Sequence, residues 1–240
     1  MEVRVVWLGH STFLFETPNG RIVIDPWLAT SPVCPDEHKA IDNVDTILLT
    51  HGHFDHIADL FDLQARCESR VVCIHELSQW LGHKGVDESK VIGMGIGGTV
   101  RLDELAVSVT MVTARHSSSF FEDGQIIYLG EPAGFVLTFD GGLTIYLAGD
   151  TDVFGDMALI RELHHPDVAI LPIGDHYTMG PTRAAKAAEL LGARKIIPCH
   201  YGTFPVLAGT PSALSSALHT LGVQTDVEAL AIGGEVTLRG

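Results

Sequence analysis

The sequence predicts an α/β (α+β) fold, a four-layer αββα sandwich, on three observations. Short apolar runs separated by turn residues come first along the chain, which indicates an antiparallel meander of strands. Alternating strand-like and helix-like segments follow, and the whole order of meander and β/α units then repeats. We therefore expect two similar halves, each a mostly antiparallel sheet with helices on one face, whose uncovered apolar faces pack together.

The strands of the first half are expected as short β-type runs. Gly-His-Ser and Pro-Asn-Gly turns separate the first three of these runs. The strands are expected at residues 3–8, 12–16, 21–25, 46–50 and 71–75. Apolar residues at helical spacing within residues 57–69 predict a helix, and residues 76–83 predict a shorter one.

The second half begins with strands joined by Gly or Asp turns and then alternates strands with helices. Its strands are expected at residues 99–102, 105–114, 134–139, 143–148, 168–172, 195–200 and 235–240. Its helices are expected at residues 154–165, 181–192 and 211–222. Because no linker, low-complexity tract or long repeat interrupts this order, we expect one domain over residues 1–240.

The composition limits the classes of partner. Lys plus Arg number 15 against 30 Asp plus Glu, which gives a net charge of −15. A charge of this sign repels phosphate backbones and anionic lipids, so it disfavours long nucleic acids and membranes and favours a small-molecule substrate. The four cysteines show no C-x-x-C spacing, and the first residues lack the layout of a signal peptide, which predicts reduced thiols and a cytoplasmic location.

Metal-ligand residues crowd the segment TILLTHGHFDHIADL, residues 46–60. His51 and His53 follow a strand at spacing i, i+2, so both can face one ion. Asp55 and His56 come where the chain turns into a helix and can face a second position. Since a tetrahedral ion needs three or four ligands, these two pairs suggest two incomplete sites.

Three further candidates each stand just beyond an apolar strand, where loops gather at one edge of a sheet. They are His116, Asp150 and His200. Together with the crowded segment they make five histidines and two aspartates. This set suits two divalent ions that share a carboxylate and keep open positions for water.

These residues, in this order, resemble the metallo-β-lactamase superfamily. Its signature H-x-H-x-D-H is matched by residues 51–56, and its later His, Asp and His are matched by His116, Asp150 and His200. The resemblance covers essentially the whole chain. The segments WLGHSTFLFE, IDPWL, RHSSS, LAGDTDVF, IGDHYTMGP and CHYGTF are similar to those of UPF0173-type metal-dependent hydrolases, relatives of the L-ascorbate-6-phosphate lactonases.

The resemblance implies two divalent metal ions, with zinc favoured and manganese, nickel or iron also suitable. The implied ligands are His51, His53 and His116 for the first ion and Asp55, His56 and His200 for the second, with Asp150 bridging them. His53 stands where the di-iron flavoproteins of the superfamily place Glu, which favours the hydrolase pattern.

The implied reaction is hydrolysis of a small anionic ester, lactone or phosphodiester by a hydroxide between the two ions. Asp55 is a candidate catalytic residue because its carboxylate can orient that hydroxide besides binding metal. His176, after the apolar run of residues 168–174, is expected to face the pocket and to stabilise developing charge or protonate the leaving group. His10 is a further candidate of this kind, and Asp25 is a candidate hydrogen-bond acceptor for a ligand histidine.

Two motifs are set aside, and two other functions stay open. Residues 93–98 fit G-x-G-x-x-G, but a strand-like segment follows, so we expect a turn there. The serines at residues 117–119 lack the G-x-S-x-G context of a nucleophile.

The open alternatives are a metal or ligand binder without turnover and an iron-dependent oxidoreductase on the same scaffold. Association into a homo-oligomer is also open.

Overall fold

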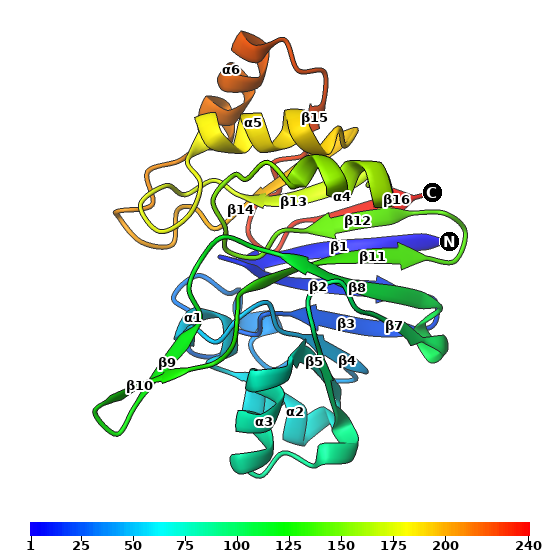
Figure 1. Ribbon diagram of the computed structural model, residues 1–240, viewed down its shortest axis with the longest axis vertical. Coiled ribbons are helices and arrows are strands. Elements are labelled where there is room, and N and C mark those ends of the chain that lie inside the picture. The colour runs from blue at the N-terminus through cyan, green and yellow to red at the C-terminus, as the bar shows by residue number, and fades with distance from the viewer.

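The computed structural model describes residues 1–240 and contains two seven-stranded sheets that lie between two layers of helices (Figure 1). The predicted αββα sandwich is therefore confirmed. In spatial order the first sheet consists of β16 (Glu235–Arg239), β1 (Glu2–Gly9), β2 (Thr12–Thr17), β3 (Gly20–Ile24), β4 (Thr46–Leu48), β5 (Arg70–Ile74) and β6 (Val91–Met94). The second consists of β15 (Asp226–Val227), β14 (Lys195–Cys199), β13 (Val168–Pro172), β12 (Thr144–Leu147), β11 (Ala133–Phe139), β8 (Val107–Thr113) and β7 (Thr99–Leu102).

Both sheets are mixed, so the expectation of mostly antiparallel sheets is wrong. The first is antiparallel from β16 to β3 and parallel from β3 to β6. The second is antiparallel from β7 to β12 and parallel from β12 to β15. Parallel neighbours require a crossover, and α-helices provide it for every parallel pair except β3 and β4, which the long segment of residues 25–45 joins. The last strand, β16, pairs with β1, so the chain returns to the first half at its end.

The helices cover the outer faces of the two sheets (Figure 1). They are α1 (Phe54–Ile57), α2 (Leu60–Cys67) and α3 (His75–His83) beside the first sheet, and α4 (Met157–His164), α5 (Pro181–Leu191) and α6 (Pro211–Leu221) beside the second. Short 3₁₀ turns lie at η1 (Asp36–His38), η2 (Glu88–Lys90) and η3 (Asp103–Leu105). The helix expected over residues 57–69 is interrupted at Asp59, whose carboxylate accepts the Leu28 N–H at 2.6 Å.

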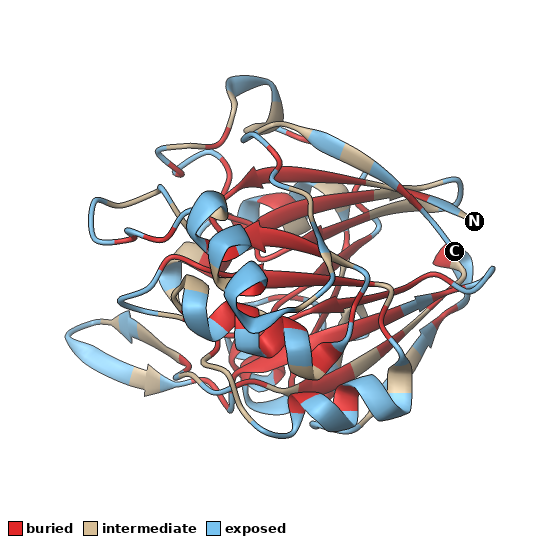
Figure 2. Cartoon of the chain, turned by 90° about the horizontal axis from the view of Figure 1, so that it is seen from above, coloured by how far each residue is buried: buried red, intermediate tan, exposed pale blue.

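Apolar side chains fill the space between the two sheets. A cluster of 49 buried residues draws on strands of both, including Trp7, Phe15, Phe135 and Phe139. A second cluster of 19 lies between the second sheet and its helices, where the alanines of α5 allow close packing. Figure 2 shows most strands of the two sheets buried and the outer helix faces exposed. No helix is both long and apolar enough to cross a membrane.

A two-stranded hairpin that we did not predict from the sequence projects from the body of the molecule (Figure 1). It consists of β9 (Ser119–Glu122) and β10 (Gln125–Tyr128). Its inner face rests on α3, since the ring of Phe120 lies 5.4 Å from that of Trp80. The turn at Asp123–Gly124 between apolar runs is a hairpin signal that could have predicted it. Of residues 93–98, in contrast, the first two end β6 and residues 95–98 form the expected turn before β7.

Candidate metal centre

The predicted ligand residues meet at one end of the two sheets because each follows a strand end. His51 lies just beyond β4, His116 beyond β8, Asp150 beyond β12 and His200 beyond β14. Gly149 before Asp150 has φ +62°, and a Cβ there would come within 2.8 Å of Thr50. Only glycine therefore lets the two sheets approach closely enough at this point.

The carboxylate of Asp150 lies at the centre of the group. Its Oδ2 is 3.0 Å from His200 Nε2, 3.4 Å from His56 Nε2 and 3.7 Å from His116 Nε2. Asp150 is 3% exposed. Burial alone would raise the pKa of this carboxyl, but His200 and His56 hold it well below its usual range. One ionised oxygen thus faces histidines from both predicted ligand sets.

His51, His53 and His116 form one compact group, with ligand nitrogens within 4.8 Å of one another. His51 Nε2 lies 2.9 Å from His53 Nδ1. Burial lowers the pKa of all three imidazoles, that of His51 most strongly. They are therefore neutral near pH 7, which is the state in which histidine binds metal.

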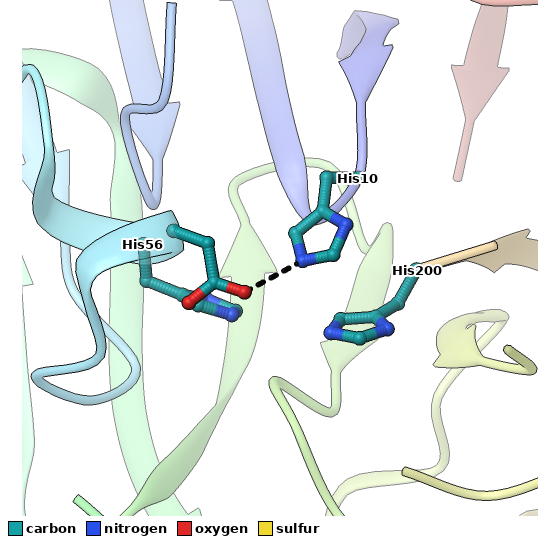
Figure 3. Close-up of side chains that lie close together, drawn as sticks. His10, His56 and His200 are labelled. Atoms are coloured by element: carbon teal, nitrogen blue, oxygen red, sulfur yellow. Dashed lines mark hydrogen bonds and ion pairs between the residues drawn. The ribbon is translucent and has the colours of Figure 1, made fainter. Parts of the chain in front are cut away.

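The second group contains Asp55, His56 and His200 and, in addition, His10. His10 Nε2–H donates to Asp55 Oδ2 at 3.0 Å, and His10 Nδ1 accepts from the Thr203 hydroxyl at 3.0 Å. Figure 3 shows the rings of His10, His56 and His200 gathered from separate segments, with the hydrogen bond of His10 dashed. Burial lowers the pKa of His10 to about 4. Burial alone would raise the pKa of Asp55, but the hydrogen bond from His10 and the charges of His56 and His10 together outweigh it and bring that pKa to about 2.

Asp25 orients two of the histidines without lying in either group of predicted ligands. Its Oδ2 accepts from His56 Nδ1–H at 2.7 Å and from the Thr50 hydroxyl at 2.6 Å, and its Oδ1 accepts from the Thr50 N–H at 2.8 Å. The same hydroxyl accepts from His51 Nδ1–H at 3.0 Å. Because the Nδ1 atoms of His51 and His56 are engaged in these hydrogen bonds, their Nε2 atoms point into the centre, as in many metal sites.

The backbone is strained at this centre. His10, Asp25 and His200 have φ of 51°, 47° and 53°, in the left-handed region that few residues other than glycine adopt. Such residues cost free energy and gather at functional sites, where surrounding contacts hold them. Here the hydrogen bond from the His200 N–H to the His10 carbonyl, 2.9 Å long, joins two of the three.

His176 lies outside the group, contrary to the sequence prediction that it faces the pocket. The chain turns after β13 through left-handed Asp175 and His176, with φ of 66° and 60°, and this carries the His176 side chain to the exposed surface. Its ring contacts only that of Tyr177 among aromatic neighbours, at 4.4 Å. Tyr177, one residue further on, lines the central cavity instead.

The residues present fit divalent metal ions. Neutral imidazoles and ionised carboxylates are the ligands that zinc and related ions take. His56 Nε2 is buried and has no hydrogen-bond partner, a costly state that a bound cation would relieve. Asp150 and Asp25 outweigh burial and raise the pKa of His56 well above its usual value, so metal binding there would displace a proton.

The domain model described as "Beta-lactamase superfamily domain" matches residues 20–201. A UPF0173 metal-dependent hydrolase of Chloroflexus aurantiacus is 49% identical over 238 residues, covering 98% of this chain and 97% of its own. This chain belongs to the beta-lactamase superfamily and, within it, to the UPF0173 metal-dependent hydrolases. The family member of Archaeoglobus fulgidus is 45% identical, covering 96% of this chain and 97% of its own. The fold of this UPF0173 hydrolase also matches that of Igni18, a metallo hydrolase of Ignicoccus hospitalis, at 34% identity and TM-score 0.87 over the whole of both chains.

A cavity of ≈ 880 Å³ opens above the predicted ligand residues of this UPF0173 hydrolase. Its floor includes His53, Asp55, His116, Asp150 and His200. Its wall is mostly aromatic and aliphatic, and its lining includes no lysine or arginine. The volume is within the usual range for small-molecule sites. The sequence does not predict this wall, because apart from Phe54 on α1 its residues lie on loops and on the unexpected β9–β10 hairpin.

Proposed function

We propose that the chain is a binuclear metal-dependent hydrolase of small esters, lactones or phosphodiesters. The observation that carries this proposal is the position of Asp150 Oδ2, which faces His116 from one group and His56 and His200 from the other. A carboxylate placed in this way suits two ions that share it. Zinc suits this donor set best, and manganese, nickel or iron also fit it.

The ligand assignment follows the two groups. His51, His53 and His116 would hold one ion, Asp55, His56 and His200 would hold the other, and Asp150 would contact both. Once bound, such a pair lowers the pKa of water and polarises a carbonyl or phosphoryl oxygen. The chain itself contributes the fixed orientation of the imidazoles through Asp25 and Thr50.

Asp55 has the position expected of a group that orients the attacking water. With a pKa of about 2 it is ionised at neutral pH, and it opens into the cavity. His10 holds its Oδ2, which leaves the second carboxylate oxygen for metal or water. The lining contains no cationic side chain, so any preference for an anionic substrate would come from bound metal alone.

Elemental analysis of protein expressed without added metal tests the proposal, followed by hydrolysis assays with that metal. We expect about two ions per chain and turnover of at least one class among lactones, esters and phosphodiesters. The variant His51→Ala should lose metal and activity together. A single ion would contradict the binuclear site, iron with a redox-linked colour would support the oxidoreductase, and no turnover on any class would support the binder.

We further propose a cytoplasmic enzyme with one domain over residues 1–240. All four cysteines are free, which supports a reducing compartment. Sedimentation would determine whether it forms a homo-oligomer.

A further inference from the structure

The mouth of the cavity is lined by large apolar side chains that remain exposed. Phe54 is 56% exposed, Phe121 70%, Tyr177 57% and Val206 46%. They come from α1, from the β9–β10 hairpin and from the loops after β13 and β14. We call this set, together with Phe120 and Phe204, the aromatic rim; all six line the cavity. Apolar side chains gathered in this way on a soluble protein mark a binding surface.

The aromatic rim is a preformed wall. Trp27 lies beneath it, with ring centroids 5.7 Å from Phe54 and 5.9 Å from Phe204. Phe120 packs on Trp80, as described above for the hairpin. Edge and tilted ring contacts of this kind add stability beyond simple burial, so they favour one position for the rings of Phe54, Phe120 and Phe204.

The charge around the rim indicates what it binds. The cavity lining contains no lysine or arginine, and the chain as a whole carries a net charge of −15. A charged tail on the substrate would find no partner on these walls. The floor of the same cavity holds the metal-ligand residues, so a substrate bound there has its distal part against the rim.

We propose that the substrate carries an uncharged apolar substituent, an alkyl chain or an aryl ring, which packs against the aromatic rim while its ester-type group lies on the metal-ligand floor. This inference rests on the proposed hydrolase function. It names the part of the substrate that the rim selects, whereas the floor selects the bond that is cleaved.

A series of γ-lactones that differ only in alkyl length, from γ-butyrolactone to γ-dodecalactone, tests this. A fully buried methylene is worth roughly fourfold in binding, so on this half-open wall we expect kcat/KM to rise about twofold per methylene before it levels off. Calorimetric titration of the same lactones into the metal-depleted chain should show affinity that tightens by a similar factor. This second measurement reports binding by the rim independently of the hydrolytic step, because it does not require turnover.

Phe121→Ala and Val206→Ala should each flatten the dependence of kcat/KM and of affinity on alkyl-chain length. Leu163→Ala is the matched control, since Leu163 on α4 is 71% exposed and lies outside the cavity. Ile126→Ala tests the hairpin itself, because Ile126 pairs with Phe121 across the two strands but does not line the cavity.

The inference is overturned if both kcat/KM and affinity are independent of chain length, or if Phe121→Ala keeps the wild-type slope. It is also overturned if Phe121→Ala instead converts a dimer to a monomer with unchanged lactone affinity, since the rim would then be an interface between copies. If no lactone is hydrolysed while affinity still rises with length, the proposed function fails on this substrate class and the rim assignment is retained.

Discussion

The floor and the rim of the cavity are built in opposite ways. The floor consists of buried and half-buried polar groups near strand ends, and Asp25, Thr50 and His10 hold His56, His51 and Asp55 around it by hydrogen bonds. The rim consists of exposed apolar rings on loops and a hairpin. A buried polar group held by hydrogen bonds tolerates little change, whereas an exposed ring can be replaced at little cost in stability. We therefore expect the floor to fix the chemistry and the rim to fix the choice of substrate.

The largest effect is expected for Asp150→Asn. The amide keeps the shape but removes the negative charge that faces three histidines. Metal content should fall toward zero at both positions, and kcat/KM should fall by about 10³-fold or more on the best substrate found. Elemental analysis and steady-state kinetics measure this. His116→Ala is the comparison, because it should empty one position only. Two retained ions in Asp150→Asn would contradict its central role.

Asp25→Asn should have the next largest effect, although Asp25 is not a predicted ligand. The amide offers a poorer acceptor to His56 Nδ1–H and to the Thr50 hydroxyl, so the imidazoles lose their fixed orientation. Metal affinity should weaken about 10–100-fold, as measured by competition with a chelator. Asp62→Asn on the exposed face of α2 is the matched control. Equal affinities in the two variants would exclude an orienting role for Asp25.

His10 should make the stability of the metal-free chain depend on pH. Its pKa is about 4 in the folded chain, whereas an unfolded histidine titrates near 6.5. The unfolded state therefore binds the extra proton first, and stability falls as the pH drops from about 6.5 to about 4. The part of the unfolding free energy that His10 contributes, and that is lost over this pH range, is on the order of 3 kcal/mol. His51, His53 and His116 act in the same direction, and His56, with its raised pKa, acts against them.

Urea unfolding of the chelator-treated wild type and of His10→Gln at pH 7, 5 and 4 isolates the His10 share. Glutamine can still donate to Asp55 but does not titrate. The difference in unfolding free energy between the two proteins should shrink as the pH falls, because only the wild type loses the His10 contribution. Parallel pH dependences would mean that His10 is not buried as a neutral imidazole.

The floor could be predicted from the sequence because strand ends and alternation determine it. His51 and His53, two residues apart beyond one strand, lie together, and His116, Asp150 and His200 follow other strands of the sandwich. The role of His10 needed the structure, since only the left-handed turn after β1 brings its ring to Asp55. The rim was missed because Phe121 and Val206 belong to segments whose place depends on tertiary packing rather than on periodicity.

The smallest effects are expected at neighbouring residues 176 and 177, where the sequence and the structure disagree. The sequence predicts that His176→Ala keeps metal but loses rate, whereas the exposed side chain in the structure leads us to expect kcat within about twofold of wild type. Tyr177→Ala should instead raise KM about threefold, because it removes part of the rim. Steady-state kinetics of both variants on one alkyl lactone distinguish the two expectations for His176. A tenfold loss of kcat in His176→Ala with metal retained would show that the turn after β13 rotates during turnover, and the floor would then extend to a residue that the structure places outside it.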